Sequence, residues 1–278
     1  MKYYFLHSNE FWLISRGAYA EFMGRFAAAT SMRAASAAPG IDSAQLMQAL
    51  SLANAQRPNS TIEQDTGIAH ISAFGPMGRD LPPLARAIGA TDYSQLHNDF
   101  ASALAAGARG VLLHCATPGG TVSGAPETAD MIANFPKPVM VHVTEACSAG
   151  YWLASGADMI WADPSSLVGS IGIILPRTDL SALMEKVGAV DDAITNTGAD
   201  LKGIDYEGEL TADQRAYLVS LADDMASEFH QHVANNRAIS PESLRGGVMF
   251  GRKALSANLI DAIGSASDAR DALLTRLG

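Results

Sequence analysis

A serine within a run of small residues is the feature of the sequence that most directly suggests catalysis. Ser148 lies in Ala146-Cys147-Ser148-Ala149-Gly150, between an apolar run at 139–143 and an alanine-containing helical stretch at 151–157. This order predicts a strand, a tight turn and a helix. Small residues allow a sharp bend that brings amide N–H groups close to whatever the hydroxyl attacks, so nucleophile and oxyanion hole can be built together. An ordinary helix N-cap is an equally good interpretation of Ser148 on this segment alone.

A second turn of small residues, Thr117-Pro118-Gly119-Gly120, follows the apolar run at 110–115. Such a turn is typical of an ordinary strand-to-helix bend. Because Gly119 and Gly120 lack side chains, a backbone N–H there could also approach a developing oxyanion, together with the N–H of Ala149. Loops at the carboxyl ends of neighbouring parallel strands converge on one crevice. We therefore expect these two turns and the loop at 163–170 to share a site.

The histidines are poor candidates for the base that a serine nucleophile needs. His70, His114 and His142 lie inside apolar runs, where an imidazole usually belongs to the core. His230 and His232 are two residues apart on a predicted helix and so point to opposite faces, which also excludes them as a metal pair. The sequence contains no His-Glu-x-x-His or Cys-x-x-Cys spacing. We therefore expect neither a metal nor a cofactor.

Lys202, in Gly198-Ala199-Asp200-Leu201-Lys202-Gly203, is the remaining candidate base. An ordinary lysine side chain has a pKa near 10.4, so only about 0.04% is the free amine at pH 7. Lowering such a pKa to about 7 by burial requires roughly 4 to 5 kcal/mol of destabilisation of the ammonium. The hydroxyl of Ser170 is suited to hold the neutral amine. Taken alone, the segment is typical of a solvated loop lysine.

The bulk composition narrows the class of protein. The chain has 278 residues, 48% of them hydrophobic, which is enough for a sizeable core. A net charge of −10 argues against non-specific binding to nucleic acid or to anionic lipid. Two cysteines, Cys115 and Cys147, do not make a disulfide framework, so a reducing compartment fits best. No N-terminal run reaches the ~20 apolar residues of a membrane span, and we expect a cytoplasmic protein without a membrane anchor.

Apolar runs alternate with helical patterns from Gly67 onward, which predicts an α/β fold with largely parallel pairing. Residues 1–60 differ in composition and are predicted to be a flexible or partner-docking arm with a helix in Ser43–Ala55, while 61–278 form the domain. A capping box at Thr211 and Gln214 begins a long helix with an apolar stripe from Tyr217 to Val233, and Ser240-Pro241 begins another. The remaining predicted strands cover 68–73, 110–115, 139–143, 159–162, 168–175 and 193–196, and the remaining helices 93–106, 125–135, 151–157 and 179–187.

Taken together, these motifs resemble the Ser/Lys serine peptidases related to signal peptide peptidase A, especially the branch that matures phage heads. The resemblance covers roughly residues 67–278 and includes a closing Leu259-Ile260-Asp261 motif. It implies a Clp protease/crotonase-like ββα spiral and a hydrolase that works through an acyl-enzyme. Ser148 is then the nucleophile, Lys202 the general base and Ser170 the residue that orients the lysine. The oxyanion hole would consist of N–H groups from Gly119 or Gly120 and from Ala149.

The resemblance also implies partners: polypeptide substrates such as capsid or scaffold precursors, and a homo-oligomeric ring in which the dyad is formed either within one protomer or between adjacent protomers. Three departures from the family pattern stand out: Ala149 and Thr117 replace common glycine and serine, and Asn258 stands where glycine commonly precedes Leu-Ile-Asp. Lys186 is the nearest alternative base. Two other functions stay open: a crotonase-type acyl-CoA enzyme using Glu145, and a catalytically silent capsid-assembly protein that keeps the fold.

Overall fold

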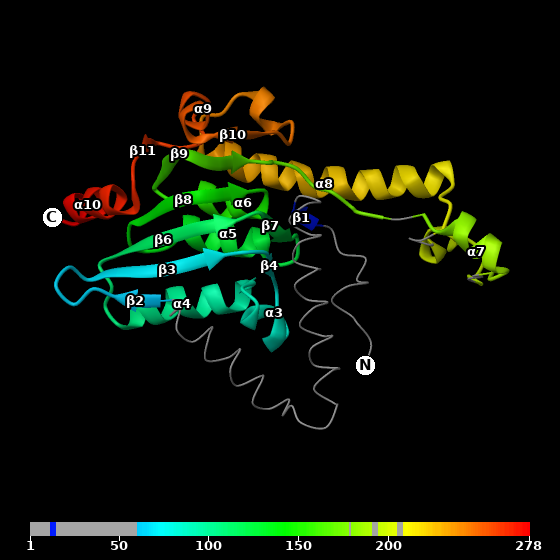
Figure 1. Cartoon of the computed structure of the whole chain (residues 1–278), viewed down its shortest axis with the longest axis horizontal. Coiled ribbons are helices and arrows are strands. Elements are labelled where there is room, and N and C mark those ends of the chain that lie inside the picture. Colours follow the sequence, from blue (N-terminus) through cyan, green and yellow to red (C-terminus); the bar gives the residue numbers. More distant parts are fainter. Residues whose placement is uncertain (1–11, 15–59, 178, 191–193, 205–207) are drawn as a thin grey trace, which may run out of the picture.

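The computed structural model describes residues 12–14, 60–177, 179–190, 194–204 and 208–278. Its main feature is a seven-stranded sheet in the order β10-β9-β8-β6-β3-β2, with β11 beside β9 (Figure 1). The four central strands are parallel, and β2 and β10 are antiparallel edges. The strands are β2 (Ser60–Ile62), β3 (Ile68–Phe74), β6 (Gly110–Thr117), β8 (Val139–Cys147), β9 (Met159–Gly169), β10 (Val248–Phe250) and β11 (Ala262–Ile263).

Helices cover both faces of this sheet, which is why its central strands are nearly continuous apolar runs. On one face, Ile71, Leu113 and Val141 pack with α4 (Tyr93–Ala105), α5 (Ala125–Ala133) and α6 (Ala149–Ser155) in one large core. On the other face, Leu112 and Met140 pack against α10 (Ala266–Leu277). The alternation of side chains along each strand thus divides the apolar residues between two cores.

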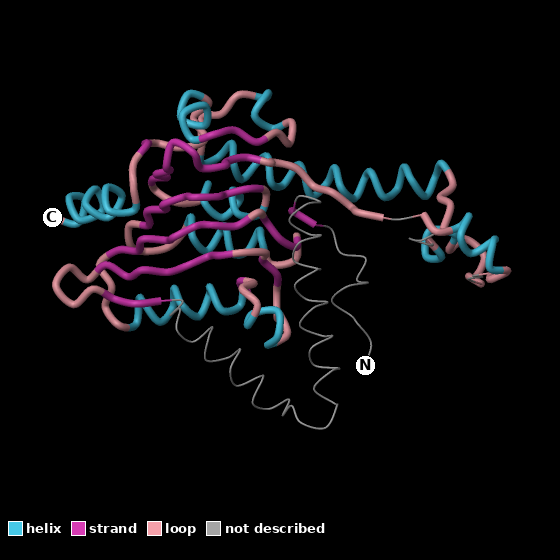
Figure 2. Tube along the Cα trace, in the orientation of Figure 1, coloured by secondary structure: helices cyan, strands magenta, loops and turns pink. Residues whose placement is uncertain are grey.

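A second, four-stranded sheet has the order β1-β7-β4-β5. Its strands β4 and β7 directly follow the main strands β3 and β6, and a helical segment follows each of them in turn (Figure 2). The chain therefore repeats a strand, strand, helix unit, which is the Clp protease/crotonase-like ββα spiral that the sequence predicts. The elements are β1 (Trp12–Ile14), β4 (Met77–Gly78), β5 (Thr91–Asp92), β7 (Gly119–Thr121) and the short helix α3 (Pro83–Ala87).

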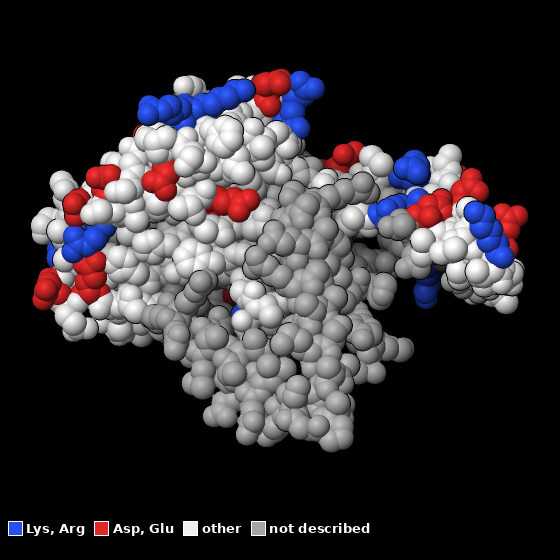
Figure 3. Space-filling view, in the orientation of Figure 1, with Lys and Arg blue, Asp and Glu red and all other residues white. Residues whose placement is uncertain are grey.

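An extension leaves the body of the domain after β9. It carries α7 (Ser181–Val187) and a 3₁₀ turn at Asp200–Gly203, and the chain returns along α8 (Ala212–Asn236). Arg177 donates a hydrogen bond to the carbonyl of Gly208, which joins the outgoing and returning segments of the extension. The extension lies at the outer end of α8, away from the sheet (Figure 1), and its surface mixes acidic and basic side chains (Figure 3).

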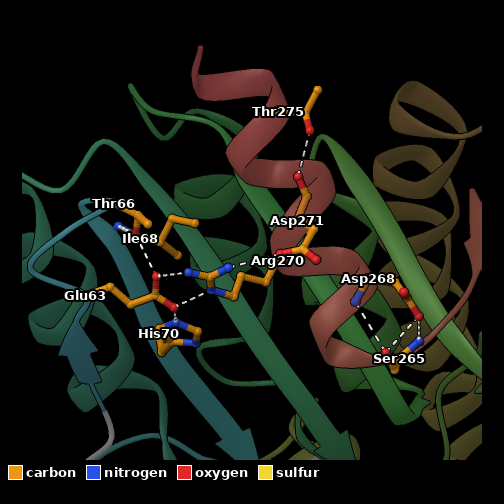
Figure 4. A network of polar contacts seen from close by, with 9 residues as sticks. All are labelled: Glu63, Thr66, Ile68, His70, Ser265, Asp268, Arg270, Asp271 and Thr275. Carbon is orange, nitrogen blue, oxygen red and sulfur yellow. Dashed lines mark hydrogen bonds and ion pairs between the residues drawn. The ribbon is translucent and has the colours of Figure 1, made fainter.

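The C-terminal helix α10 is fixed to the edge of the sheet by a polar network (Figure 4). Arg270 donates to both carboxylate oxygens of Glu63 at 2.7 Å, and Glu63 also accepts a 2.7 Å bond from His70 in β3. The other ring nitrogen of His70 lies 3.0 Å from His114 in β6. A capping box between Ser265 and Asp268 begins the helix. These contacts join the C-terminal helix α10 to Glu63, which follows β2, and through His70 to strands β3 and β6.

Several predicted elements differ from those in the structure. One continuous strand, β9, replaces two predicted strands, and residues 170–175 leave it because Ser170 has a positive φ of 55°. Residues 194–196 are not a strand, and Ser240-Pro241 begins a 3₁₀ turn, Pro241–Leu244, without a side-chain cap. The capping box of α8 is confirmed, but only Phe229 and Val233 of its predicted stripe are buried. The helix predicted at 43–55 lies outside the described residues.

Candidate functional site

The Ser148 turn joins β8 to α6, as the sequence predicts. Ser148 has φ 55° and ψ −118°, a conformation that non-glycine residues rarely adopt, and its exposed fraction is 2%. It occupies the N-cap position of α6, yet its side chain makes no capping hydrogen bond. The hydroxyl instead lies 3.4 Å from the carbonyl oxygen of Gly172. The strained backbone therefore aims the hydroxyl away from its own helix, and the interpretation of Ser148 as an ordinary side-chain cap is wrong.

The turn at Gly169-Ser170 lies directly beside the Ser148 turn. Cys147 pairs with Gly169 at the end of the sheet, and the Ser148 N–H donates to the Gly169 carbonyl at 2.8 Å. Ser170 is held in its positive-φ conformation by a 2.7 Å bond from its N–H to the carbonyl of Gly247. The structure thus brings Ser148 and Ser170 together, each in a backbone conformation that costs free energy of about 1 to 3 kcal/mol.

The Thr117–Gly120 turn contacts the same helix. Gly150 sits so close to Thr117 that a Cβ at Gly150 would overlap the Thr117 methyl group. Gly119 has φ 114° and its N–H donates to the Thr117 hydroxyl at 3.1 Å, while Gly120 packs against the backbone of Met77 with no room for a Cβ. Both glycines are therefore required by the backbone. Gly119 and Gly120 in β7 and Ala149 at the start of α6 thus lie in two elements that contact each other, and their role as an oxyanion hole stays a prediction.

Helix α6 is short and is fixed by residues from the last third of the chain. The Tyr151 hydroxyl donates to the Leu259 carbonyl at 2.9 Å, and the Trp152 ring stacks on Phe229 of α8 at 4.3 Å with an interplanar angle of 5°. Arg237 follows α8, and its guanidinium donates to the carbonyls of Ser155 and Ala157 at the end of α6. These contacts hold the helix that follows Ser148 at both ends.

Arg237 and Asp261 form a pair that the sequence analysis did not single out as functional. The Arg237 side chain is 7% exposed and lies 2.7 Å from Asp261, which also accepts the N–H of Ile160 in β9 at 2.7 Å. This explains why Leu259-Ile260-Asp261 matters: its backbone holds Tyr151 and its carboxylate holds Arg237. The motif was visible in the sequence, but its partner Arg237 carries no local signal.

Lys202 is not brought to Ser148 within one chain. It lies in the exposed 3₁₀ turn of the extension, which Figure 1 places with α7 at the outer end of α8. Lys186, the alternative base, lies in the last turn of α7 in the same extension, and none of the described residues of that helix is buried. The lysine assignment thus stays a prediction, and a single copy of the chain does not assemble the dyad.

Two kinds of titratable group around the Ser148 turn, the Cys147 thiol and the histidines within the sheet, are not suited to act as its base. Burial raises the pKa of the Cys147 thiol to about 12, so this neighbour of Ser148 stays protonated. His70, His114 and His142 lie mid-strand on the face that α10 covers, and burial lowers the pKa of His114 to about 4. His142 lies 3.2 Å from the Gly264 carbonyl. In the described residues there is no cluster suited to a metal ion and no helix apolar and long enough to cross a bilayer.

Comparisons with known proteins bear on the family of the chain. The model of "Peptidase family S49" matches residues 133–277, which include Ser148, Ser170, Lys202 and Asp261. The chain is 30% identical over 234 residues to head-tail preconnector protein GP5 of Enterobacteria phage P21, covering 81% of this chain and 46% of that protein. It is 33% identical over 177 residues to capsid assembly protease C of Escherichia phage lambda, covering 60% and 40%.

A third relative is the putative protease slr0021 of Synechocystis, 29% identical over 175 residues that cover 60% of this chain and 63% of that protein. The chain thus spans less than two thirds of the length of each of these relatives. The residues that the family model matches make up more than half of the chain. They include the Ser148 turn, the paired ends of β8 and β9, and both Arg237 and Asp261. The chain belongs to peptidase family S49.

Proposed function

We propose that this chain is a serine endopeptidase with Ser148 as its nucleophile. The observation that carries the proposal is the Ser148 turn, because a nearly buried serine is held at positive φ, where glycine is the favoured residue, and its hydroxyl does not cap its own helix. The relatives named as proteases support the same activity. One of these relatives is named as a capsid assembly protease. We therefore propose scaffold or capsid precursors as the substrates of this chain, inside a procapsid or the host cytoplasm.

The oxyanion hole in this proposal consists of backbone N–H groups on two sides of the hydroxyl. Ala149 is the first residue of α6, and N–H groups in the first turn of a helix have no acceptor within it. Gly119 already donates to Thr117, which favours Gly120 as the second donor. Two such donors stabilise the tetrahedral oxyanion, and loss of one from a hole of this kind typically costs about 100-fold to 1,000-fold in kcat.

The base we propose is Lys202 of a neighbouring copy of the chain. The extension that carries it exposes apolar side chains that a lone domain would bury: Val187, Val190 and Ile194 are 67%, 89% and 93% exposed. Such a surface is typical of a subunit interface. If the extension packs on the next copy, as in a homo-oligomeric ring, it delivers the lysine to the Ser148 of that copy, where burial lowers its affinity for a proton.

The reaction then has two steps. Ser148 Oγ attacks the scissile carbonyl while the neutral lysine takes its proton, and the Ala149 and Gly120 amides stabilise the oxyanion. The lysine returns the proton to the leaving amine, which leaves an acyl-enzyme. The same lysine then activates water, which releases the acyl group and restores the serine. Ser170, beside Ser148, orients the amine by a hydrogen bond.

Mixed assemblies test this proposal. Ser148→Ala and Lys202→Ala should each lack proteolysis when purified alone, and co-assembly of the two should restore it, because some sites then combine an intact serine with an intact lysine. Lys186→Ala is the matched control and should stay active. Activity in Ser148→Ala alone would refute the nucleophile. Inactive mixtures would refute the shared dyad, and an inert wild type that still assembles would favour a silent capsid-assembly protein.

A further inference from the structure

The N-terminal part of the chain contributes a strand to the candidate active site. β1 pairs antiparallel with β7, and the register sets Ile14 opposite Gly119, Leu13 opposite Gly120 and Trp12 opposite Thr121. One of these two glycines, Gly120, is the oxyanion donor that we propose in β7. A segment separated from them by more than a hundred residues of sequence thus lies along the strand that borders the nucleophile.

The two neighbours of β7 differ in how firmly they belong to the domain. On one edge lies β4, whose Met77 is 1% exposed and packs against Gly120 too closely for any side chain there. The other edge pairs with β1, which consists of three residues. Of the two, β4 cannot leave without breaking the core. β1 is therefore the neighbour that can exchange with another strand.

An extended peptide commonly binds by adding a strand to an exposed sheet edge, where main-chain hydrogen bonds supply affinity. A polypeptide substrate must lie extended beside Ser148 for its carbonyl to reach both the hydroxyl and the oxyanion donors. The edge of β7 occupied by β1 offers such a place, because it runs along Gly119 and Gly120. β1 and a substrate strand would then compete for the same backbone groups.

We propose that the β1 edge of β7 is a binding site for extended peptide and that residues 12–14 occupy it as an internal competitor of the substrate. This inference rests on the proposed peptidase function. It gives the N-terminal segment a role at the site, docked on its own domain rather than on a separate partner. If β1 occupies the edge about 90% of the time, only about a tenth of the molecules accept substrate, and displacing β1 raises the apparent second-order rate about tenfold.

A proline in β1 tests the competition in the full chain. Leu13→Pro removes one N–H and disfavours strand pairing, whereas Ala37→Pro, outside β1, is the control. The readout is the rate at which a fluorophosphonate probe with an extended peptide labels Ser148, compared with a small fluorophosphonate lacking a peptide. We expect Leu13→Pro to raise the peptide-probe rate several-fold or more and to change the small-probe rate little. Equal peptide-probe rates in Leu13→Pro, Ala37→Pro and wild type would overturn the inference.

A reversible crosslink tests the same inference in the opposite direction. Directly opposed residues on paired strands lie within disulfide reach, so Trp12→Cys with Thr121→Cys should lock β1 onto β7 under oxidant. Oxidation should then abolish peptide-probe labelling and reduction should restore it, whereas in wild type and in each single variant the labelling rate should be the same under oxidising and reducing conditions. A disulfide that fails to form, or that leaves labelling intact, contradicts the inference. If no variant labels Ser148 with either probe, the proposed function itself fails.

Discussion

The backbone N–H of Ser148 donates a 2.8 Å hydrogen bond to the carbonyl oxygen of Gly169. This bond joins two strand ends that each continue into a serine at positive φ, Ser148 and Ser170. The Ser148 turn is held by this bond to β9, and the Ser170 turn is held by a bond from its own N–H to the Gly247 carbonyl, so the backbones of the two turns keep a fixed relation to each other. The candidate active site is therefore a property of paired strand ends rather than of one loop.

The close approach of α6 to the Thr117 turn predicts a specific rescue. Gly150→Ala should destabilise the fold by about 1 to 3 kcal/mol, because its new methyl overlaps that of Thr117. Thr117→Ser removes that methyl and keeps the hydroxyl that accepts the Gly119 N–H. The double variant should recover most of the stability and activity, as measured by denaturant unfolding and peptide hydrolysis. A double variant no better than Gly150→Ala would show that the two turns do not meet as described.

The Arg237–Asp261 pair is predicted to position the nucleophile helix. Arg237→Met leaves the carbonyls of Ser155 and Ala157 without their donors, so we expect a loss of about 1 to 3 kcal/mol in stability. We also expect kcat to fall with little change in KM, because the helix after Ser148 loses its fixed end. Leu273→Ala, in α10 on the opposite face, is the matched control, since it should lower the melting temperature without lowering kcat. Equal kcat in both variants would contradict the positioning role.

Asn258 explains one departure from the family pattern and predicts a ranking. Its φ is 58°, in the left-handed region, and its side chain donates to the Ala238 carbonyl at 3.0 Å. Asparagine and glycine both tolerate this conformation, whereas other side chains are strained there by roughly 1 to 2 kcal/mol. Thermal unfolding should therefore rank wild type and Asn258→Gly close together, with Asn258→Val clearly lower. A fully stable Asn258→Val would show that the left-handed turn is not required.

The network at α10 predicts a loss of stability in acid. Burial lowers the pKa of His114 to about 4 in the folded chain, whereas an unfolded histidine titrates near 6.5. The unfolded chain thus binds this proton first, and stability should fall as the pH drops from about 6.5 to about 4. Glu63, whose pKa Arg270 lowers to about 2, adds a second loss below about 4.5. The free energy of unfolding, measured at a series of pH values, should show that His114→Gln removes the pH dependence between about 6.5 and about 4 but keeps the loss due to Glu63. An unchanged slope between these two pH values in His114→Gln would contradict this.

The sequence predicts the local backbone of the Ser148 turn better than the contacts around it. The starts of β6 and β8, the strand-turn-helix order at Ser148 and the capping box of α8 are local signals, and the structure agrees with each; β8 runs on to Cys147, four residues beyond its predicted end. Three features depend on contacts between residues distant in sequence: the ion pair of Arg237 with Asp261, the pairing of β1 with β7 and the continuity of β9. Such contacts leave no periodicity or spacing to read. The position of Lys202 in the outer extension was unpredictable for the same reason.

Covalent labelling with residue-level identification tests the central claim most directly. Wild-type assembly is treated with a small fluorophosphonate, digested and analysed by mass spectrometry, beside Ser148→Ala and Ser170→Ala. We expect one stoichiometric adduct on Ser148, none in Ser148→Ala, and slower labelling in Ser170→Ala. An adduct on a different residue, or proteolysis that persists in Ser148→Ala, would contradict it.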